Sequence, residues 1–311
     1  MSIGLSAIEY ALPDTRPNLS ELEREGLLDT PAERLRDFGF EFALVGHEPS
    51  SDLGIAAAAS LLNHSAVDPE SVDAVICAGA IPSSHAVANH EPLGGFAYPA
   101  SRIQYECGMV NARAIGISQM GCMGMMTAVK CAADLLVANP AASRVLCVSA
   151  DVLPPGSKRE IMYNVISDGA CAVLVERESP RNRIVAHRHL TKGYYWDCTS
   201  RLNEIVAAYF PTSRHIVLET LAEHDLTPND LAWLIPHNVS RRSWEILSKL
   251  LGLPMEKVFT ENIAARGHVI AADNFINLKD AEDAGRLKPS DKLLLFNFGF
   301  GANWGCLLLE H

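Results

Sequence analysis

Continuous apolar runs recur along the first half of the chain, separated by stretches with helical spacing. Runs at residues 71–79, 143–151 and 168–176 keep their few charged residues near their ends. This pattern predicts strands that are buried on both faces of a sheet. Because strands of this kind alternate with helices, we expect an α/β protein.

The remaining segments of the first half are assigned from capping and turn signals. A first strand is expected at residues 2–12, followed by a polar surface excursion to about residue 36. Ser51 and Asp52 form an N-capping pair for a helix that extends to about residue 62. A loop rich in His, Ser and Pro then precedes a helix that begins near residue 101.

The residues after about 178 repeat the same order of strands and helices. We expect strands at residues 183–186, 231–236, 258–260, 292–298 and 303–309, and helices at 204–224, 241–250 and from Gly267 to Asn274. Two halves with a similar order of elements, residues 1–178 and 179–311, predict a duplicated α/β unit. No internal repeat is visible at the level of single residues.

Cys122 stands where a strand-like run, residues 112–118, meets a helix-like one that ends near Asn139. The helix is expected to be buried on nearly all sides. A thiol in its first turn faces the positive end of the helix dipole, which favours the nucleophilic thiolate. Gly121 and Gly124 allow a sharp turn and a close approach to the main chain. The alternative is an inert buried cysteine, since free cysteine is among the most buried residue types.

Composition and charge narrow the function classes. With 48% hydrophobic and 20% charged residues among 311, the chain has an ordinary soluble composition. A net charge of −11 without basic runs argues against a nucleic-acid-binding surface, although it does not exclude a local basic patch for an acidic carrier protein. We expect no membrane span and no leader sequence, and therefore a cytoplasmic protein.

The eight cysteines include no CxxC pair and lie mostly within apolar runs. This pattern favours reduced core cysteines over a disulfide framework or a zinc site. His237 and His268 each follow a predicted strand or turn and, together with Cys122, fit nucleophilic catalysis by a thiol with two imidazoles. Metal ligation by the same three residues is the alternative, but none lies at helical or loop ligand spacing, so no metal site is expected.

At this point the sequence resembles the thiolase-fold condensing enzymes, and most closely the β-ketoacyl carrier-protein synthase III family. The resemblance covers nearly the whole chain and rests on four motifs in family order. They are residues 121–124 around the nucleophile, 235–238 around His237, 168–170 at a mid-chain strand and the glycine loop at 298–305. A dinucleotide-binding fingerprint is excluded for the glycine loop because no helix or downstream acidic residue follows it.

The resemblance implies a five-layered αβαβα fold whose first half carries Cys122 and whose second half carries the histidines and the glycine loop. It also implies that Cys122 takes an acyl group from a thioester of coenzyme A (CoA) or of the phosphopantetheine of an acyl carrier protein, without a cofactor. A malonyl-type thioester then loses carbon dioxide, and its carbanion attacks the acyl-enzyme. Hydrogen-bond donors must stabilise the enolate oxygen, and in the family a His and an Asn do so.

Two departures concern this chemistry. His268 stands at the family Asn position, and we expect His237 and His268 each to donate to the enolate oxygen from a neutral ring. Phe300 replaces the family's middle glycine, whose backbone N–H forms the oxyanion hole with the N–H of Cys122. A side chain there keeps the N–H but crowds the pocket.

Two further expectations concern substrate and assembly. Tyr98 matches a family aromatic residue that closes the partner's acyl pocket across a homodimer interface, although an ordinary half-buried tyrosine is the alternative. Its hydroxyl favours a short or polar acyl chain. Residues 31–42 lack the family's adenine-binding tryptophan and arginine, so carrier-protein delivery is as consistent with the sequence as free CoA.

These departures leave three functions open. The first is a decarboxylating ketosynthase of fatty acid or polyketide biosynthesis, in specialised metabolism. The second is an acyltransferase that moves the acyl group from Cys122 to an oxygen, nitrogen or sulfur acceptor without decarboxylation. The third is a degenerate subunit that partners an active homologue, which the retained Cys122 and His237 argue against.

Overall fold

The computed structural model describes residues 2–81 and 98–311, so most of the expected loop before residue 98 lies outside the described residues. Nine of the described strands follow one another in the order β3-β2-β4-β7-β1-β8-β11-β10-β9. They are β1 (Ile3–Ala11), β2 (Ala74–Ala78), β3 (Arg113–Ile117), β4 (Arg144–Asp151), β7 (Gly169–Arg177), β8 (Arg183–Thr191), β9 (Trp233–Pro236), β10 (Lys292–Gly299) and β11 (Asn303–Glu310). A small hairpin, β5 (Glu160–Ile161) and β6 (Asn164–Val165), stands apart.

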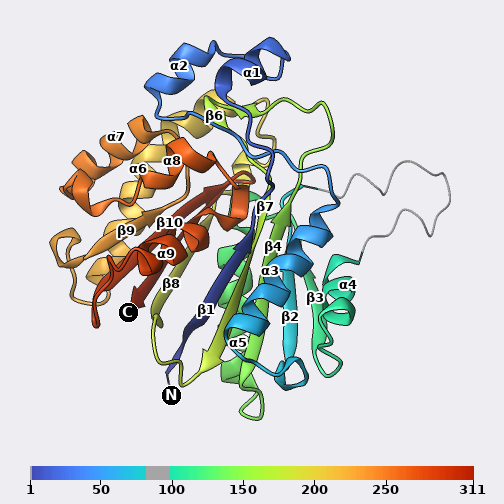
Figure 1. Ribbon diagram of the computed structural model, residues 1–311. Coiled ribbons are helices and arrows are strands. Elements are labelled where there is room, and N and C mark those ends of the chain that lie inside the picture. The colour runs from blue at the N-terminus through green and yellow to red at the C-terminus, as the bar shows by residue number, and fades with distance from the viewer. Residues whose placement is uncertain (1, 82–97) are drawn as a thin grey trace.

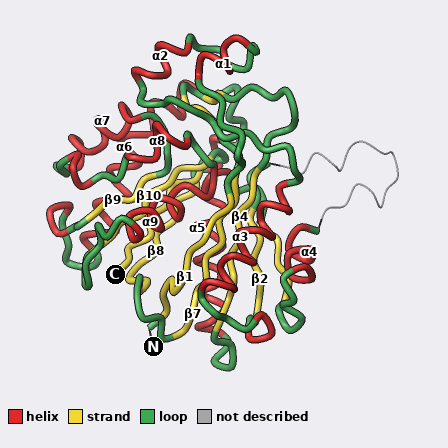
Figure 2. The backbone as a smooth tube through the Cα atoms, viewed as in Figure 1, coloured by secondary structure: helices red, strands yellow, loops and turns green. Residues whose placement is uncertain are grey.

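The strand order falls into two parts that meet at β1 and β8. Within the described chain these two strands pair only through Gly4 and Arg183. Arg183 also pairs with Glu310, so both chain ends lie at this junction, as Figure 2 shows. Strands β8 to β11 all follow residue 182, and we call them the second sheet. The five strands on the other side, β3, β2, β4, β7 and β1, all precede residue 178 and form the first sheet.

Three clusters of buried apolar side chains define the layers. Helices α3 (Ser50–His64) and α4 (Pro99–Glu106) cover the outer face of the first sheet, where Leu61 and Ile103 are buried. Helices α5 (Gly124–Ala138) and α9 (Asp273–Asp283) lie between the sheets, and α6 (Leu202–Ala222) and α7 (Arg241–Leu251) cover the outer face of the second. Figure 1 shows α4 and α7 at opposite sides of the molecule. The five-layered αβαβα fold is thereby confirmed.

The polar segment before residue 36 is not a surface excursion. It forms α1 (Leu19–Arg24) and α2 (Ala32–Asp37), and Leu19, Leu22 and Leu35 are fully buried. Asn18 caps α1 reciprocally: its side chain accepts from the N–H of Glu21, whose carboxylate accepts from the N–H of Asn18. The prediction was wrong because few apolar residues in short helices are enough to cover the edge of a large core.

Two other local predictions were wrong. Helix α3 begins at Ser50 after Pro49 without a side-chain cap, and Asp52 pairs instead with Arg102 at 2.5 Å. Residues 258–260 do not extend the sheet, since Val258 forms only an isolated bridge with Leu234. A short helix, α8 (Glu261–Arg266), follows them.

Helix α5 is more exposed than its sequence predicts. Cys131, Asp134 and Val137 form an exposed face, and 44% of the segment Gly121–Ala138 is buried. Among the described helices, this segment alone is long and apolar enough to cross a membrane, contrary to the expectation that none is. Helix α5 packs against β2 and β4 as a core helix does. A core helix can be as long and as apolar as a membrane span.

Asp168, directly before β7, joins three loops at the end of the sheet opposite to the contact between β1 and β8. Its carboxylate accepts hydrogen bonds from Gly46 N–H at 2.8 Å and Leu153 N–H at 2.9 Å, and pairs with the Arg159 guanidinium at 2.6 Å. Both members of the ion pair are buried. Removing one partner therefore leaves an uncompensated buried charge.

Asp168→Ala is expected to lower the free energy of unfolding by about 3–5 kcal/mol, because it strands the Arg159 charge. The control is Asp134→Ala, which removes an exposed i,i+4 partner of Lys130 and should cost about 0.5 kcal/mol. Urea unfolding of both variants measures the difference. Equal destabilisation would contradict the structural role of Asp168.

Candidate active site

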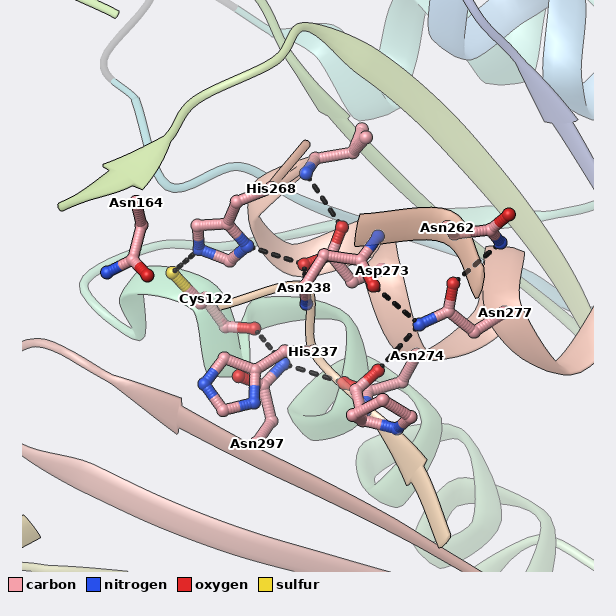
Figure 3. A network of polar contacts seen from close by, with 12 residues as sticks. Cys122, Asn164, His237, Asn238, Asn262, His268, Asp273, Asn274, Asn277 and Asn297 are labelled. Atoms are coloured by element: carbon pink, nitrogen blue, oxygen red, sulfur yellow. Dashed lines mark hydrogen bonds and ion pairs between the residues drawn. The ribbon is translucent and has the colours of Figure 1, made fainter. Parts of the chain in front are cut away.

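Cys122, His237 and His268 lie in turns at the ends of separate strands and helices, and the fold brings them together (Figure 3). Cys122 lies in a 3₁₀ turn, Gly121–Met123, between β3 and α5, and His237 directly follows β9. The Cys122 Sγ is 3.1 Å from His268 Nε2, and the two imidazole centroids are 6.0 Å apart. The three residues singled out from the sequence therefore form one site.

Close contact between two glycine turns sets the position of the thiol. Gly121 has φ +50°, and a Cβ there would come within 3.0 Å of the Phe300 backbone nitrogen. A Cβ on Gly299 would lie 2.4 Å from the Met120 carbonyl oxygen and 3.1 Å from the Cys122 nitrogen. The backbone nitrogens of Cys122 and Phe300 thus belong to loops in contact, but their role as an oxyanion hole remains a prediction.

Cys122 differs from the cysteines of the core. It is partly buried, whereas Cys77, Cys147, Cys171 and Cys306 are buried. Burial raises the pKa of Cys77 and of Cys306 to about 12, which keeps both as unreactive thiols. The buried cysteines therefore do not compete with Cys122 for an electrophile.

His268 connects the thiol to a buried carboxylate. Its Nδ1 donates to Asp273 Oδ2 at 2.5 Å, while Nε2 faces the Cys122 sulfur. Burial lowers the pKa of His268, but the sulfur of Cys122 and the carboxylate of Asp273 outweigh it and raise that pKa well above its ordinary value. The geometry is that of a Cys–His–Asp triad in which both neighbours favour the charged form of the imidazole.

Asp273, which the sequence did not single out, is fixed by backbone donors. Its Oδ2 also accepts from Asn238 N–H at 2.6 Å, and its Oδ1 accepts from Val269 N–H at 2.7 Å. It is the first residue of α9, where the helix dipole favours a carboxylate. An aspartate at a helix start normally indicates capping, so the sequence carried no separate signal for a catalytic partner.

His237 is in a different state from His268. It is buried, and its Nδ1 lies 3.3 Å from the Phe296 carbonyl oxygen. Burial, together with the charge on His268, lowers the pKa of His237 to about 3. Nε2 has no hydrogen-bond partner among the residues described. Its surroundings therefore favour the neutral ring, whereas the contacts of His268 favour the charged one.

Buried asparagines hold the site in place, and none of them was identified from the sequence as part of it. Asn297 donates to the Cys122 carbonyl oxygen and to Asn274 Oδ1, both at 2.8 Å. Asn277 donates to the Pro236 carbonyl oxygen at 2.8 Å. These amides link the nucleophile turn to β10, α9 and β9, as the dashed contacts in Figure 3 show.

A cavity of about 1200 Å³ opens beside the nucleophile turn. Ser118 and Gln119, which precede Cys122, line it together with Tyr98 and Pro99 at the start of α4. Tyr98 is 67% exposed in the single chain. Its insertion into the acyl pocket of a partner subunit stays a prediction. No cluster of three or more metal-ligating side chains occurs in the described parts of the chain.

Comparison with known proteins gives the same fold. Residues 118–193 match the family model of 3-oxoacyl-[acyl-carrier-protein] synthase III, and residues 221–311 match the model of its C-terminal part. The β-ketoacyl-[acyl-carrier-protein] synthase III of Sodalis glossinidius is 31% identical over 282 residues, which cover 85% of this chain and 84% of that protein.

Solved structures extend the similarity over the whole length. The 3-oxoacyl-[acyl-carrier-protein] synthase III of Aquifex aeolicus has a TM-score of 0.85 at 24% identity, covering 99% of this chain and 100% of that one. ChlB3, described as an acyltransferase, has a TM-score of 0.87 at 24% identity, covering 100% and 98%. At this identity the structures support the fold.

Asp273→Asn is expected to slow alkylation of Cys122 by iodoacetamide about tenfold or more at pH 7, because an unassisted thiol is only a few per cent ionised there. The pKa of His268 is raised by the Cys122 sulfur and by the Asp273 carboxylate. The amide removes the second of these charges, so the imidazolium that supports the thiolate is less favoured. The difference should disappear as the pH rises and an unassisted thiol ionises.

The matched control is Asp283→Asn, at the exposed end of the same helix, which should react like the wild type. Mass spectrometry of the alkylated peptide gives the rate for each protein between pH 5 and 10. Identical profiles for Asp273→Asn and wild type would show that the carboxylate does not act on the thiol.

Proposed function

We propose, because this chain belongs to the β-ketoacyl-[acyl-carrier-protein] synthase III family, that Cys122 accepts an acyl group from a thioester and passes it to the carbanion of a malonyl-type thioester. The chain is a condensing enzyme of this family. The observation that carries the proposal is the 3.1 Å contact between Cys122 Sγ and His268 Nε2, with Asp273 behind the ring.

In the first half-reaction the Cys122 thiolate attacks the thioester carbonyl carbon. The charge that develops on the carbonyl oxygen is stabilised by the backbone N–H groups of Cys122 and Phe300. As the C–S bond to the donor breaks, the imidazolium of His268 supplies the proton that the leaving thiolate needs. Acyl-Cys122 and a free thiol result, and His268 takes up a proton from solvent before the second half-reaction. The scheme requires no cofactor.

In the second half-reaction the malonyl group loses carbon dioxide, and an enolate forms before it attacks acyl-Cys122. The enolate oxygen requires a hydrogen-bond donor, and a protonated His268 presents N–H at Nε2. The apolar surroundings of His237, including the Trp244 and Phe296 rings at 5.5 and 6.0 Å, favour loss of the charged carboxylate as neutral carbon dioxide.

Acyl carrier protein and CoA both remain candidate carriers for the thioesters. Arg241 and Arg242 begin α7, close after the His237 loop, and both side chains are exposed. Basic side chains at this position support docking of an acidic carrier protein. We further propose a cytoplasmic location, which accords with the free cysteines, and a role in fatty acid or polyketide biosynthesis.

The edge of the first sheet supports a homodimer. Strand β3 pairs with β2 on one side, and most of its residues are exposed. Nearby apolar side chains are also exposed: Tyr98 at 67%, Tyr105 at 78% and Val110 at 66%. An open strand edge beside apolar surface is typical of a protein interface.

Cys122→Ala is expected to abolish covalent loading by acyl thioesters, because the other thiols of the described core remain protonated. Wild type and variant are incubated with acyl-CoA and acyl-carrier-protein donors and analysed by peptide mass spectrometry. Malonyl carrier protein is then added, and carbon dioxide and the ketoacyl product are measured. A mass increase of one acyl group on a peptide with a cysteine other than Cys122 would overturn the assignment of Cys122 as the nucleophile.

The protein is expected to have twice the chain mass of 33.7 kDa by light scattering at micromolar concentration. Ile115→Lys on β3 should shift it toward the monomer, because a charge enters the proposed interface. Ile246→Lys on α7 is the matched control, since Ile115 and Ile246 are 36% and 38% exposed. A monomeric wild type would contradict the dimer.

A further inference from the structure

The turn that joins β10 to β11, residues 300–302, carries one of the two backbone N–H groups proposed for the oxyanion hole. The Phe300 nitrogen lies beside the nucleophile turn, since a Cβ on Gly121 would come within 3.0 Å of it. Among the residues that the structure describes, none accepts a hydrogen bond from the N–H of Phe300. A backbone N–H without a protein acceptor must be satisfied by water or by a ligand, so this one is free for a substrate oxygen.

The side chain of Asn303, the first residue of β11, holds this turn. Its Nδ2 donates to the Phe300 carbonyl oxygen at 3.4 Å. A Cβ on Gly301 would lie 3.0 Å from the same nitrogen, so the amide packs directly against the turn. The pairing of β10 with β11 ends at Gly299 and Asn303 and therefore does not itself hold Phe300.

Two side chains of β8 orient the amide of Asn303. Thr191 Oγ1 donates to Asn303 Oδ1 at 2.6 Å, and His189 Nε2 lies 3.0 Å from the same oxygen. Because an amide oxygen only accepts hydrogen bonds, the His189 ring donates from Nε2. Asn303 is buried, so these contacts take the place of water. They keep the oxygen on the side of β8 and turn the NH₂ group toward Phe300.

We propose that Asn303 is a positioning residue for acyl transfer: oriented by His189 and Thr191, its amide holds the turn so that the Phe300 N–H meets the developing oxyanion. This inference deepens the proposed function and rests on it for the loading of Cys122. An oxyanion hole is effective because its donors are fixed before charge develops on the oxygen. The anchor behind Phe300 supplies that fixation in a turn that strand pairing leaves free.

Two reactions of Cys122 distinguish this role from general support of the site. Attack on a thioester carbonyl carbon places negative charge on the carbonyl oxygen, which the oxyanion donors stabilise. Alkylation by iodoacetamide displaces iodide from a saturated carbon, so no charge develops on an oxygen. Both reactions require the Cys122 thiolate. A loss of thiol reactivity therefore slows both, whereas a displaced Phe300 N–H slows only acylation.

The experiment compares full-length wild type with Asn303→Asp, which has nearly the same shape but sets an oxygen against the Phe300 carbonyl oxygen. Peptide mass spectrometry follows single-turnover acylation of Cys122 by acyl-CoA and acyl carrier protein, and alkylation by iodoacetamide at the same pH. We expect acylation to slow by about 10–10²-fold with alkylation unchanged, because outright loss of an oxyanion donor costs about 10²–10³-fold.

Variants of His189 test the same anchor from β8 without changing Asn303. His189→Leu removes a donor to the amide oxygen and should slow acylation but not alkylation. His189→Gln can still donate from its side-chain nitrogen and should recover most of the acylation rate. His215→Leu, at an exposed histidine of α6, is the control and should react like the wild type.

Equal slowing of acylation and alkylation in Asn303→Asp would show that Asn303 only supports the site, and it would overturn the inference. Unchanged acylation in this variant would overturn it as well. If Asn303→Asp does not fold, His189→Leu and His189→Gln decide between the same outcomes. A wild type that is alkylated at Cys122 but is loaded by no thioester would overturn the proposed function itself.

Discussion

The buried contact between Asp273 and His268 is the interaction on which the chemistry of the site depends. A carboxylate with no exposed surface is stable only if donors and a cation compensate it. Asp273 has both: two backbone N–H groups, from Asn238 and Val269, and the ring of His268. The Cys122 sulfur, which faces the other ring nitrogen, and this contact together raise the pKa of His268 well above its ordinary value. The fold thus places a buried Asp273–His268 pair beside the thiol of Cys122.

This interaction also makes the two histidines chemically unlike. Burial, together with the charge on His268, lowers the pKa of His237, and the contact with the Phe296 carbonyl oxygen favours a proton on Nδ1. One ring donates to the thiol side of the site and the other accepts. We propose that a site with this polarity stabilises an enolate through a single charged donor.

The apolar strands predicted an α/β protein, and the family resemblance supplied the five layers. The resemblance also supported the meeting of Cys122, His237 and His268, which are far apart in the sequence. It did not predict α1 and α2, whose few buried leucines lie in a polar segment. It also missed Asp273, because an aspartate at a helix start has the same local pattern whether it caps the helix or orients a histidine. The protonation states of His237 and His268 depend on contacts with residues distant in the chain, such as Phe296 and Cys122, and no local pattern encodes them.

The central claim is that His268 is a cation held by Asp273 while His237 is a neutral ring protonated at Nδ1. Nitrogen-15 NMR of histidine-labelled protein near pH 7, with the two rings assigned through His237→Gln and His268→Asn, measures this directly. The account predicts two protonated nitrogens for His268, and for His237 a protonated Nδ1 with an unprotonated Nε2. A neutral His268, or a His237 whose proton resides on Nε2, would contradict it.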